Sequence, residues 1–209
     1  ILPQKPKKQA MFPSTNKIDF SFLEGTEGAR IFSEYQARVS KDYQNAKALN
    51  KLSFLNNIVK GSNPFSFTLL NTILNEEGMW VARPVDLEKC LREDALDLKN
   101  TYGDSALVLR GEENHNEYIA KHLGKQLRQK GYSVGEDTIM IPLAGLDLKY
   151  DSGSPHDLVF QLIDSSEVIY APQLNKSNHG KKFNRGDEKG LPIFEDNGSR
   201  TLYSNENGL

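Results

Sequence analysis

Hydrophobic residues in the first third of the chain recur every three or four positions, as they do along one face of a helix. This stripe consists of Phe32, Tyr35, Val39, Tyr43, Ala46, Leu49, Leu52, Leu55 and Val59. The spacing predicts one helix from about 27 to 60, with Thr26 as its N-cap and Gly61 as the residue that ends it. Such a helix is roughly 50 Å long, more than a compact domain of this size needs. We therefore expect a protein partner, or self-association, through helix 27–60.

A second helix is predicted directly after the first. Asn63 before Pro64 is an N-cap followed by proline at the first helical position, and Gly78 provides the stop. Because residues 61–63 leave only a short connection, the two helices should fold back on each other and bury the apolar stripe. The sequence therefore predicts a helical hairpin over residues 26–78.

The next part of the chain alternates short apolar runs with helical patterns. Residues 79–82 are predicted to be a strand or a buried crossing, and a helix follows from Val85 to about Ala95. Residues 105–109 and 138–142 have the composition of strands, with a helix over 116–130 between them. A strand, a helix and a strand at this spacing predict a βαβ unit with two parallel strands.

After residue 142 the apolar period becomes two, as expected for strands with one buried face. Three segments are predicted to pair antiparallel across tight turns: 146–150, 158–163 and 168–170. A last hairpin is predicted over 194–203, because Asn197-Gly198 is a preferred pair for a type I′ turn. Residues 175–190 are predicted to form a long polar loop.

These patterns together predict an α+β fold. A helical hairpin packs on a mixed sheet that contains one βαβ unit and antiparallel hairpins at the C-terminal side. The predicted parts are an irregular arm over residues 1–25, the helical hairpin over 26–78 and a mixed α/β domain over 79–209 that shares its core with the helices. The arm carries three prolines and a short basic cluster without periodicity.

Composition narrows the class of protein. The 209 residues have a formal net charge of −2, which excludes a strongly basic chain. The single cysteine, Cys90, excludes an intramolecular disulfide and a cysteine-rich zinc site, and its place on an apolar stripe predicts a core thiol. We expect a cytoplasmic protein, since a single cysteine is typical of a reducing compartment. We expect no membrane partner, since the longest apolar runs are far shorter than the ~20 residues that span a bilayer. The chain begins without methionine, which is typical of a fragment.

Acidic residues on the predicted βαβ unit and on the strand after it suggest one enzymatic alternative. Asp137 starts one strand, Asp147 and Lys149 lie on the next, and Glu117 lies on the preceding helix. Carboxylates from Glu117, Asp137 and Asp147 would bind Mg²⁺, and Lys149 would orient water or stabilise developing charge beside Asp137 and Asp147. This combination predicts a metal-dependent nuclease or phosphodiesterase. Alternating charge on the solvent face of a strand explains Asp147 and Lys149 without any function.

The sequence does not match other common signatures of catalytic or ligand-binding sites, because either the residue types or their spacing differ. Residues 110–114 occupy the place of a phosphate-binding loop, but they contain one glycine and two glutamates that would repel a phosphate. His115 and His122 lie seven residues apart, about 10.5 Å along a helix axis, which is too far for one metal ion. A serine nucleophile motif is absent. No cofactor is expected apart from Mg²⁺ under the nuclease alternative.

A loop near the C-terminal end offers a contact surface. It combines cations with an aromatic ring, as a single-stranded nucleic-acid contact does, in Lys181, Lys182, Phe183 and Arg185. Asp187 and Glu188 follow at once and neutralise the positive charge, so a nucleic-acid partner is less favoured than a protein partner. By elimination, the sequence predicts a non-catalytic interaction or binding module of unknown partner, with the nuclease as the alternative.

Overall fold

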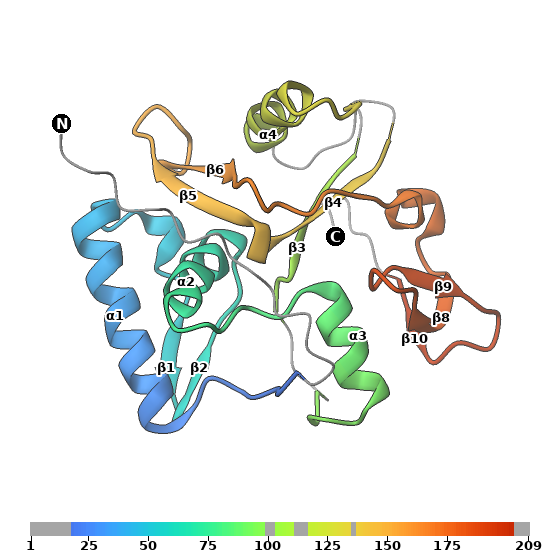
Figure 1. The fold of residues 1–209 in the computed structure, drawn as a ribbon, viewed down its shortest axis with the longest axis horizontal. Helices are drawn as coiled ribbons and strands as arrows, with labels where there is room; N and C mark the ends of the chain where they lie inside the picture. Colours follow the sequence, from blue (N-terminus) through green and yellow to red (C-terminus); the bar gives the residue numbers. More distant parts are fainter. Residues whose placement is uncertain (1–17, 99–102, 111–116, 135–136, 203–209) are drawn as a thin grey trace.

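The computed structural model describes residues 18–98, 103–110, 117–134 and 137–202 (Figure 1). Within these ranges four α-helices accompany two two-stranded and two three-stranded sheets. All the strand pairs in this part of the chain are antiparallel. The predicted α+β class is confirmed.

The first helix, α1 (Gly25–Tyr43), is much shorter than the predicted helix 27–60. It buries Ile31, Tyr35 and Val39 on the face that the apolar stripe predicts. Gln44 adopts a left-handed conformation with φ of 51° and Asn45 follows with φ of 58°, so two successive residues leave the helical region. The prediction of one long helix was therefore wrong beyond Tyr43.

A short 3-10 helix and a β-hairpin replace the second half of the predicted helix. They are η1 (Lys47–Leu49), β1 (Ser53–Leu55) and β2 (Ile58–Lys60). Between the strands, Asn56 and Asn57 have φ of 54° and 66°, the pair of positive angles that a type I′ turn requires. Two asparagines at this position were the local signal for a hairpin.

Burial in a shared core explains why the spacing misled the prediction. Ala46, Leu49 and Leu52 pack into the same core as α1, so they continue its apolar spacing after the helix has ended. Gly61 ends no helix: a Cβ there would lie 2.0 Å from the carbonyl oxygen of Lys51, so glycine permits two chain segments to approach. The long rod on which the predicted self-association rested is thus absent from the described residues.

The second helix, α2 (Pro64–Glu76), begins where the sequence predicts. The Asn63 side chain accepts hydrogen bonds from two backbone N–H groups of the first turn, at 3.0 and 3.2 Å. The two helices contact each other as predicted, and Arg38 of α1 pairs with Glu76 at 2.7 Å. The β1–β2 hairpin lies between them in the chain, so the connection is longer than predicted.

The third helix, α3 (Pro84–Arg92), also lies close to its predicted position. Residues 79–82 before it form no strand and cross the core with Val81 buried. Cys90 is 1% exposed on α3, which confirms the predicted core thiol. Its burial follows from the apolar stripe of this short helix.

The predicted βαβ unit was wrong in its strand direction. β3 (Ala106–Leu109) and β4 (Ile139–Pro142) pair antiparallel, although helix α4 (Glu117–Gln129) stands between them in the chain as predicted. A crossover helix must cover the sheet whose strands it joins. Instead, α4 packs against β6 (Leu158–Leu162) of a different sheet. It is therefore not a crossover helix that joins two parallel strands of one sheet.

Two predicted antiparallel pairings have different outcomes. β5 (Leu146–Tyr150) pairs with β6 over five residues, which confirms the first hairpin. β7 (Ile169–Tyr170) was predicted to continue this hairpin, but it pairs with β4. Ser166, in the turn before β7, donates a hydrogen bond to the Gly145 carbonyl oxygen, so the chain folds back toward the end of β4.

A small three-stranded sheet occupies the C-terminal part of the described chain. β8 (Lys182–Gly186) lies in its centre, flanked by β9 (Pro192–Phe194) and β10 (Arg200–Thr201). The predicted hairpin 194–203 was therefore wrong, because β8 separates its strands, and the predicted loop 175–190 contains β8. Gly198 has no positive φ; a Cβ there would lie 2.2 Å from the Phe183 backbone nitrogen.

Two hydrophobic cores hold these elements together. The larger core joins residues of α1, α2, α4, β5 and β6. The smaller one lies between the β3–β4–β7 sheet and the C-terminal sheet and consists of Met140, Ile169, Ala171, Leu174, Leu191 and Leu202. Figure 1 shows the β8–β10 sheet, in red, at the end of the molecule opposite α1, in blue. The C-terminal sheet thus projects from the larger core.

Candidate functional site

The acidic residues of the nuclease hypothesis lie on separate elements. Glu117 is exposed in the first turn of α4 and pairs with Lys121 at 3.2 Å. Asp137 is half-buried before β4, and Asp147 is half-buried in β5 with Lys149 exposed beside it. Among residues 18–98, 103–110, 117–134 and 137–202, no group of three or more His, Cys, Asp or Glu side chains is placed to hold a metal ion. The nuclease hypothesis gains no support from these positions and stays a prediction.

The two histidines on the larger core pack against aromatic rings. His122 stacks on Tyr118 with ring centroids 6.4 Å apart, and its Nδ1 lies 3.1 Å from the Gln126 amide nitrogen. His156 lies against Phe65, with ring centroids 5.4 Å apart. His115 and residues 111–114 of the rejected phosphate loop lie outside the described residues.

The predicted contact residues are brought together at one strand. Three of them belong to β8 and one immediately precedes it: Lys181, Lys182, Phe183 and Arg185. The Lys181 Nζ atom lies 5.4 Å from the ring centroid of Phe194 on β9. The Lys182 ammonium donates a hydrogen bond of 2.8 Å to the Thr201 hydroxyl on β10. Both neighbouring strands therefore hold the lysine side chains in place.

A β-bulge in β8 sets the directions of the next side chains. The pairing of β8 with β9 shifts between Phe183 and Arg185, and bulges re-aim side chains in this way. The Asn184 amide donates to a carboxylate oxygen of Glu195 at 2.8 Å, and the Arg185 guanidinium lies 3.8 Å from the other oxygen. The Arg200 guanidinium lies over the Phe183 ring at 4.6 Å.

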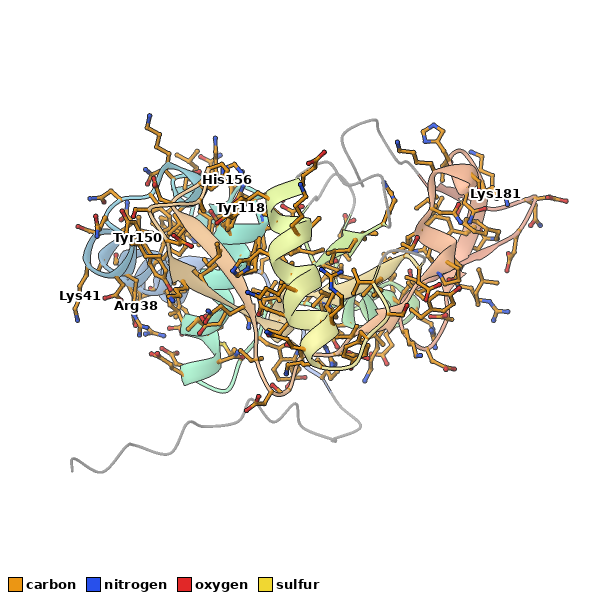
Figure 2. All side chains as sticks on the ribbon, turned by 90° about the horizontal axis from the view of Figure 1, so that it is seen from above. Arg38, Lys41, Tyr118, Tyr150, His156 and Lys181 are labelled. Carbon is orange, nitrogen blue, oxygen red and sulfur yellow. The ribbon has the colours of Figure 1, made fainter. Side chains whose placement is uncertain are left out.

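These residues border an open hollow of about 580 Å³. It is lined by Gly180, Lys181, Lys182, Phe194, Glu195 and Asp196. The lining thus contains two lysines, two acidic residues and one aromatic residue. Figure 2 shows Lys181 at the opposite end of the molecule from Arg38 and Lys41 of α1. The hollow lies on the projecting sheet and is the candidate functional site.

Glu88 of α3 fixes the sheet that carries the hollow. Its carboxylate accepts hydrogen bonds from the Gly186 backbone N–H at 2.7 Å and from the Arg200 guanidinium at 2.5 and 3.1 Å. The Glu88 side chain is 9% exposed. Gly186 permits this approach, because a Cβ there would lie 2.7 Å from a Glu88 side-chain carbon. One buried carboxylate therefore ties α3 to both β8 and β10.

Asp86, two residues earlier, fixes the start of α3. Its carboxylate accepts hydrogen bonds from the Arg83 backbone and guanidinium and from the Trp80 indole at 3.0 Å. Burial alone would raise the pKa of Asp86, but the hydrogen bonds and charge of Arg83, with the Trp80 bond, outweigh it and lower the pKa below its usual value. Asp86 is thus an ionised capping residue that holds α3 where Glu88 can reach the sheet.

Sequence reasoning identified one side of the hollow and missed the other. The lysines were visible as a local basic cluster. Phe194, Glu195 and Asp196 were assigned to a hairpin, and Glu88 was not singled out within the helix predicted from Val85 to about Ala95. Their roles depend on strand pairing and on contacts between residues about a hundred positions apart, such as the 98 positions between Glu88 and Gly186.

Comparison of the chain with protein-family models, with curated proteins and with solved structures gives no match. None of the helices in the described ranges is long and apolar enough to cross a membrane.

Proposed function

We propose that this protein is a non-catalytic interaction module that binds an extended, polar segment of a partner protein at the β8–β10 sheet. The observation that carries the proposal is the open hollow of about 580 Å³, which Lys181, Lys182, Glu195 and Asp196 line together with Phe194. A segment that carries both an acidic and a basic side chain matches this arrangement of charges.

The lining of the hollow favours a peptide over a small molecule. Sites for small molecules are concave, mostly apolar and bury most of the ligand surface. Here Phe194 is the one aromatic among six lining residues, and the lysines are exposed. Polar, wet surfaces with an aromatic at the centre are typical of contacts between proteins.

The same charges argue against a nucleic acid at this position. Two of the six lining residues, Glu195 and Asp196, carry carboxylates, which repel a phosphate backbone. Glu195 in addition accepts from Asn184 and lies near Arg185, so the local positive charge is already balanced. Single-stranded nucleic-acid sites instead combine aromatic rings with a positively charged groove.

The contacts that surround the hollow lower the cost of binding. Lys182 is held by Thr201, and Lys181 lies over Phe194. Ordering a long, rotamer-rich side chain on binding costs about 0.5–1.5 kcal/mol, and side chains that are already held avoid part of this cost. A partner therefore meets a largely pre-arranged surface.

A selection from a phage-displayed library of random peptides tests the proposal. We expect enriched peptides that carry both charge signs, with affinities measured by fluorescence polarisation. Removing both lysines (Lys181→Ala with Lys182→Ala), or the ring (Phe194→Ala), should weaken binding at least about tenfold, which corresponds to roughly 1.4 kcal/mol. Lys189→Ala is the matched control, because Lys189 is exposed between β8 and β9 and does not line the hollow.

Two outcomes would refute the proposal. The selection could yield no enriched sequence at all. Alternatively, the enriched peptides could bind the lysine-free and ring-free variants as tightly as they bind the Lys189→Ala control. No feature of the described residues favours the metal-dependent nuclease. The cytoplasmic location stays a prediction based on the single cysteine.

A further inference from the structure

The outward face of α4 carries a cationic stripe far from the β8–β10 hollow in the chain. Lys121, Lys125 and Arg128 are spaced by four and three residues, so they share one face of the helix. The opposite face is buried through Leu123 and Leu127. α4 lies at the upper edge of the molecule in Figure 1 and faces the viewer in Figure 2, where Tyr118 marks its beginning.

The charges on this face are mostly uncompensated. Lys121 is paired with Glu117 at 3.2 Å, and both side chains are about four-fifths exposed, at 80% and 78%. Lys125 and Arg128 are exposed and form no ion pair within the described part of the chain. Among the described residues, this face therefore has three cations and one paired carboxylate, on a protein whose formal net charge is −2.

An aromatic pair lies beside the cationic stripe. Tyr118 and His122 stack with their rings 6.4 Å apart and inclined by 9°. Tyr118 is three residues before Lys121, and His122 is three residues before Lys125, so the rings flank the lysines on adjoining positions of the helix surface. Both rings are half-buried, and each keeps part of its surface accessible.

We propose that this face of α4 binds single-stranded nucleic acid, with Lys125 and Arg128 on the phosphates and Tyr118 beside the bases. Sequence-tolerant sites for single strands combine cations that follow the backbone with aromatic rings that contact the bases. Arg128 suits the phosphate, because its guanidinium presents a planar set of donors. The proposal is independent of the peptide site, since it uses none of the residues that line the hollow.

An anionic membrane is the competing polyanion, and the helix lacks what it requires. Helices that lie on membranes insert a broad apolar face and keep their cations at its border. The apolar face of α4 is already buried against β6, with Leu123 and Leu127 both at 0% exposure. The outward face offers cations and the half-buried Tyr118 and His122 rings, which do not make a broad apolar face to insert.

Fluorescence anisotropy with a labelled oligouridylate of about 20 nucleotides tests the proposal. The affinity of the intact protein should fall as the salt concentration rises from about 50 to 200 mM, because each phosphate contact releases counterions. Replacing Lys125 and Arg128 together with glutamine should weaken binding at least about tenfold. It should also reduce the slope of log affinity against log salt by about 1.4, from about 0.7 for each lost contact.

The control removes two equal charges elsewhere, with Lys41→Gln on α1 and Lys189→Gln between β8 and β9, both exposed. It should change affinity less than about twofold. Circular dichroism should show unchanged helix content in both double variants, since all four side chains are exposed. Absence of salt-dependent binding by the intact protein would overturn the proposal, and so would equal losses in the two double variants. Binding to phosphatidylserine vesicles without binding to the oligouridylate would assign the stripe to membranes and overturn it as well.

Discussion

Replacing Glu88 with alanine removes the carboxylate that joins α3 to the C-terminal sheet. Three polar contacts disappear together: one from the Gly186 backbone N–H and two from the Arg200 guanidinium. The Arg200 guanidinium keeps its hydrogen bond to the Asn184 carbonyl oxygen and its place over the Phe183 ring. Gly186 is buried, so its N–H loses its partner in a site with little access to water.

The size of the expected loss in stability depends on how exposed the Glu88 and Arg200 side chains are. Breaking a buried ion pair by removing one partner costs about 3–5 kcal/mol, and a buried unsatisfied N–H adds about 1–3 kcal/mol. The Glu88 side chain is 9% exposed, but that of Arg200 is 29% exposed, so water screens the remaining charge and lowers the first contribution. We therefore expect Glu88→Ala to reduce the free energy of unfolding by about 2–4 kcal/mol. Glu88→Gln keeps an acceptor for the Gly186 N–H and should cost less.

Urea-induced unfolding measures the loss, and hydrogen exchange followed by mass spectrometry locates it. The Glu88→Ala variant should unfold at a lower urea concentration, and amides in residues 182–201 should exchange faster than those of α2. Glu93→Ala, at the C-cap of the same helix, is the control. Glu93 is 51% exposed and lies 3.9 Å from Lys89, so its loss should cost less than about 0.5 kcal/mol. The reasoning is refuted if the two variants have equal stability and residues 182–201 exchange at the original rate.

Three further substitutions test the local arguments. Asp86→Asn should reduce the free energy of unfolding by about 1–3 kcal/mol at pH 7. Because the pKa of Asp86 is lowered in the folded state, the stabilisation by its carboxylate is complete above the unfolded pKa of about 4 and disappears as pH falls through the folded pKa. The difference in unfolding free energy between the two proteins should therefore shrink below about pH 4, and a difference that stays constant would contradict a lowered pKa. Tyr35→Phe removes the 2.6 Å hydrogen bond to the Leu49 carbonyl oxygen and should cost about 1 kcal/mol in urea unfolding; an unchanged midpoint would show that this bond adds nothing. Gly198→Ala places a Cβ 2.2 Å from the Phe183 backbone nitrogen and should cost about 1–3 kcal/mol, with faster amide exchange in β8; a variant as stable as the original would contradict the close approach.

Local signals in the sequence predicted several elements close to where the structure has them. The pair Asn63-Pro64 places the start of α2, because a capping side chain and a proline at the first position act within one turn. The apolar spacing over 116–130 predicts α4, and the alternation over 146–150 predicts β5. In each case the deciding interaction joins residues a few positions apart.

Strand pairing was beyond these local signals. β7 pairs with β4 and not with β6, and β8 enters between β9 and β10. These choices depend on which edge each strand meets after the core has formed. Part of the candidate site depends on strand pairing in the same way. Lys181 and Lys182 are neighbours in sequence, whereas Arg200 contacts Glu88 across 112 positions. Sequence spacing alone therefore shows the cations of the hollow and leaves its acidic side and its support unassigned.

Nuclear magnetic resonance of the isotope-labelled protein, titrated with a peptide enriched in the selection, tests the central claim most directly. If the hollow is the binding site, amide shifts should concentrate in residues 180–183 and 194–196, with smaller changes near Glu88 through its contact with β8. Shifts that concentrate on α1 or α2, with residues 180–196 unchanged, would contradict the assignment of this sheet as the interaction surface.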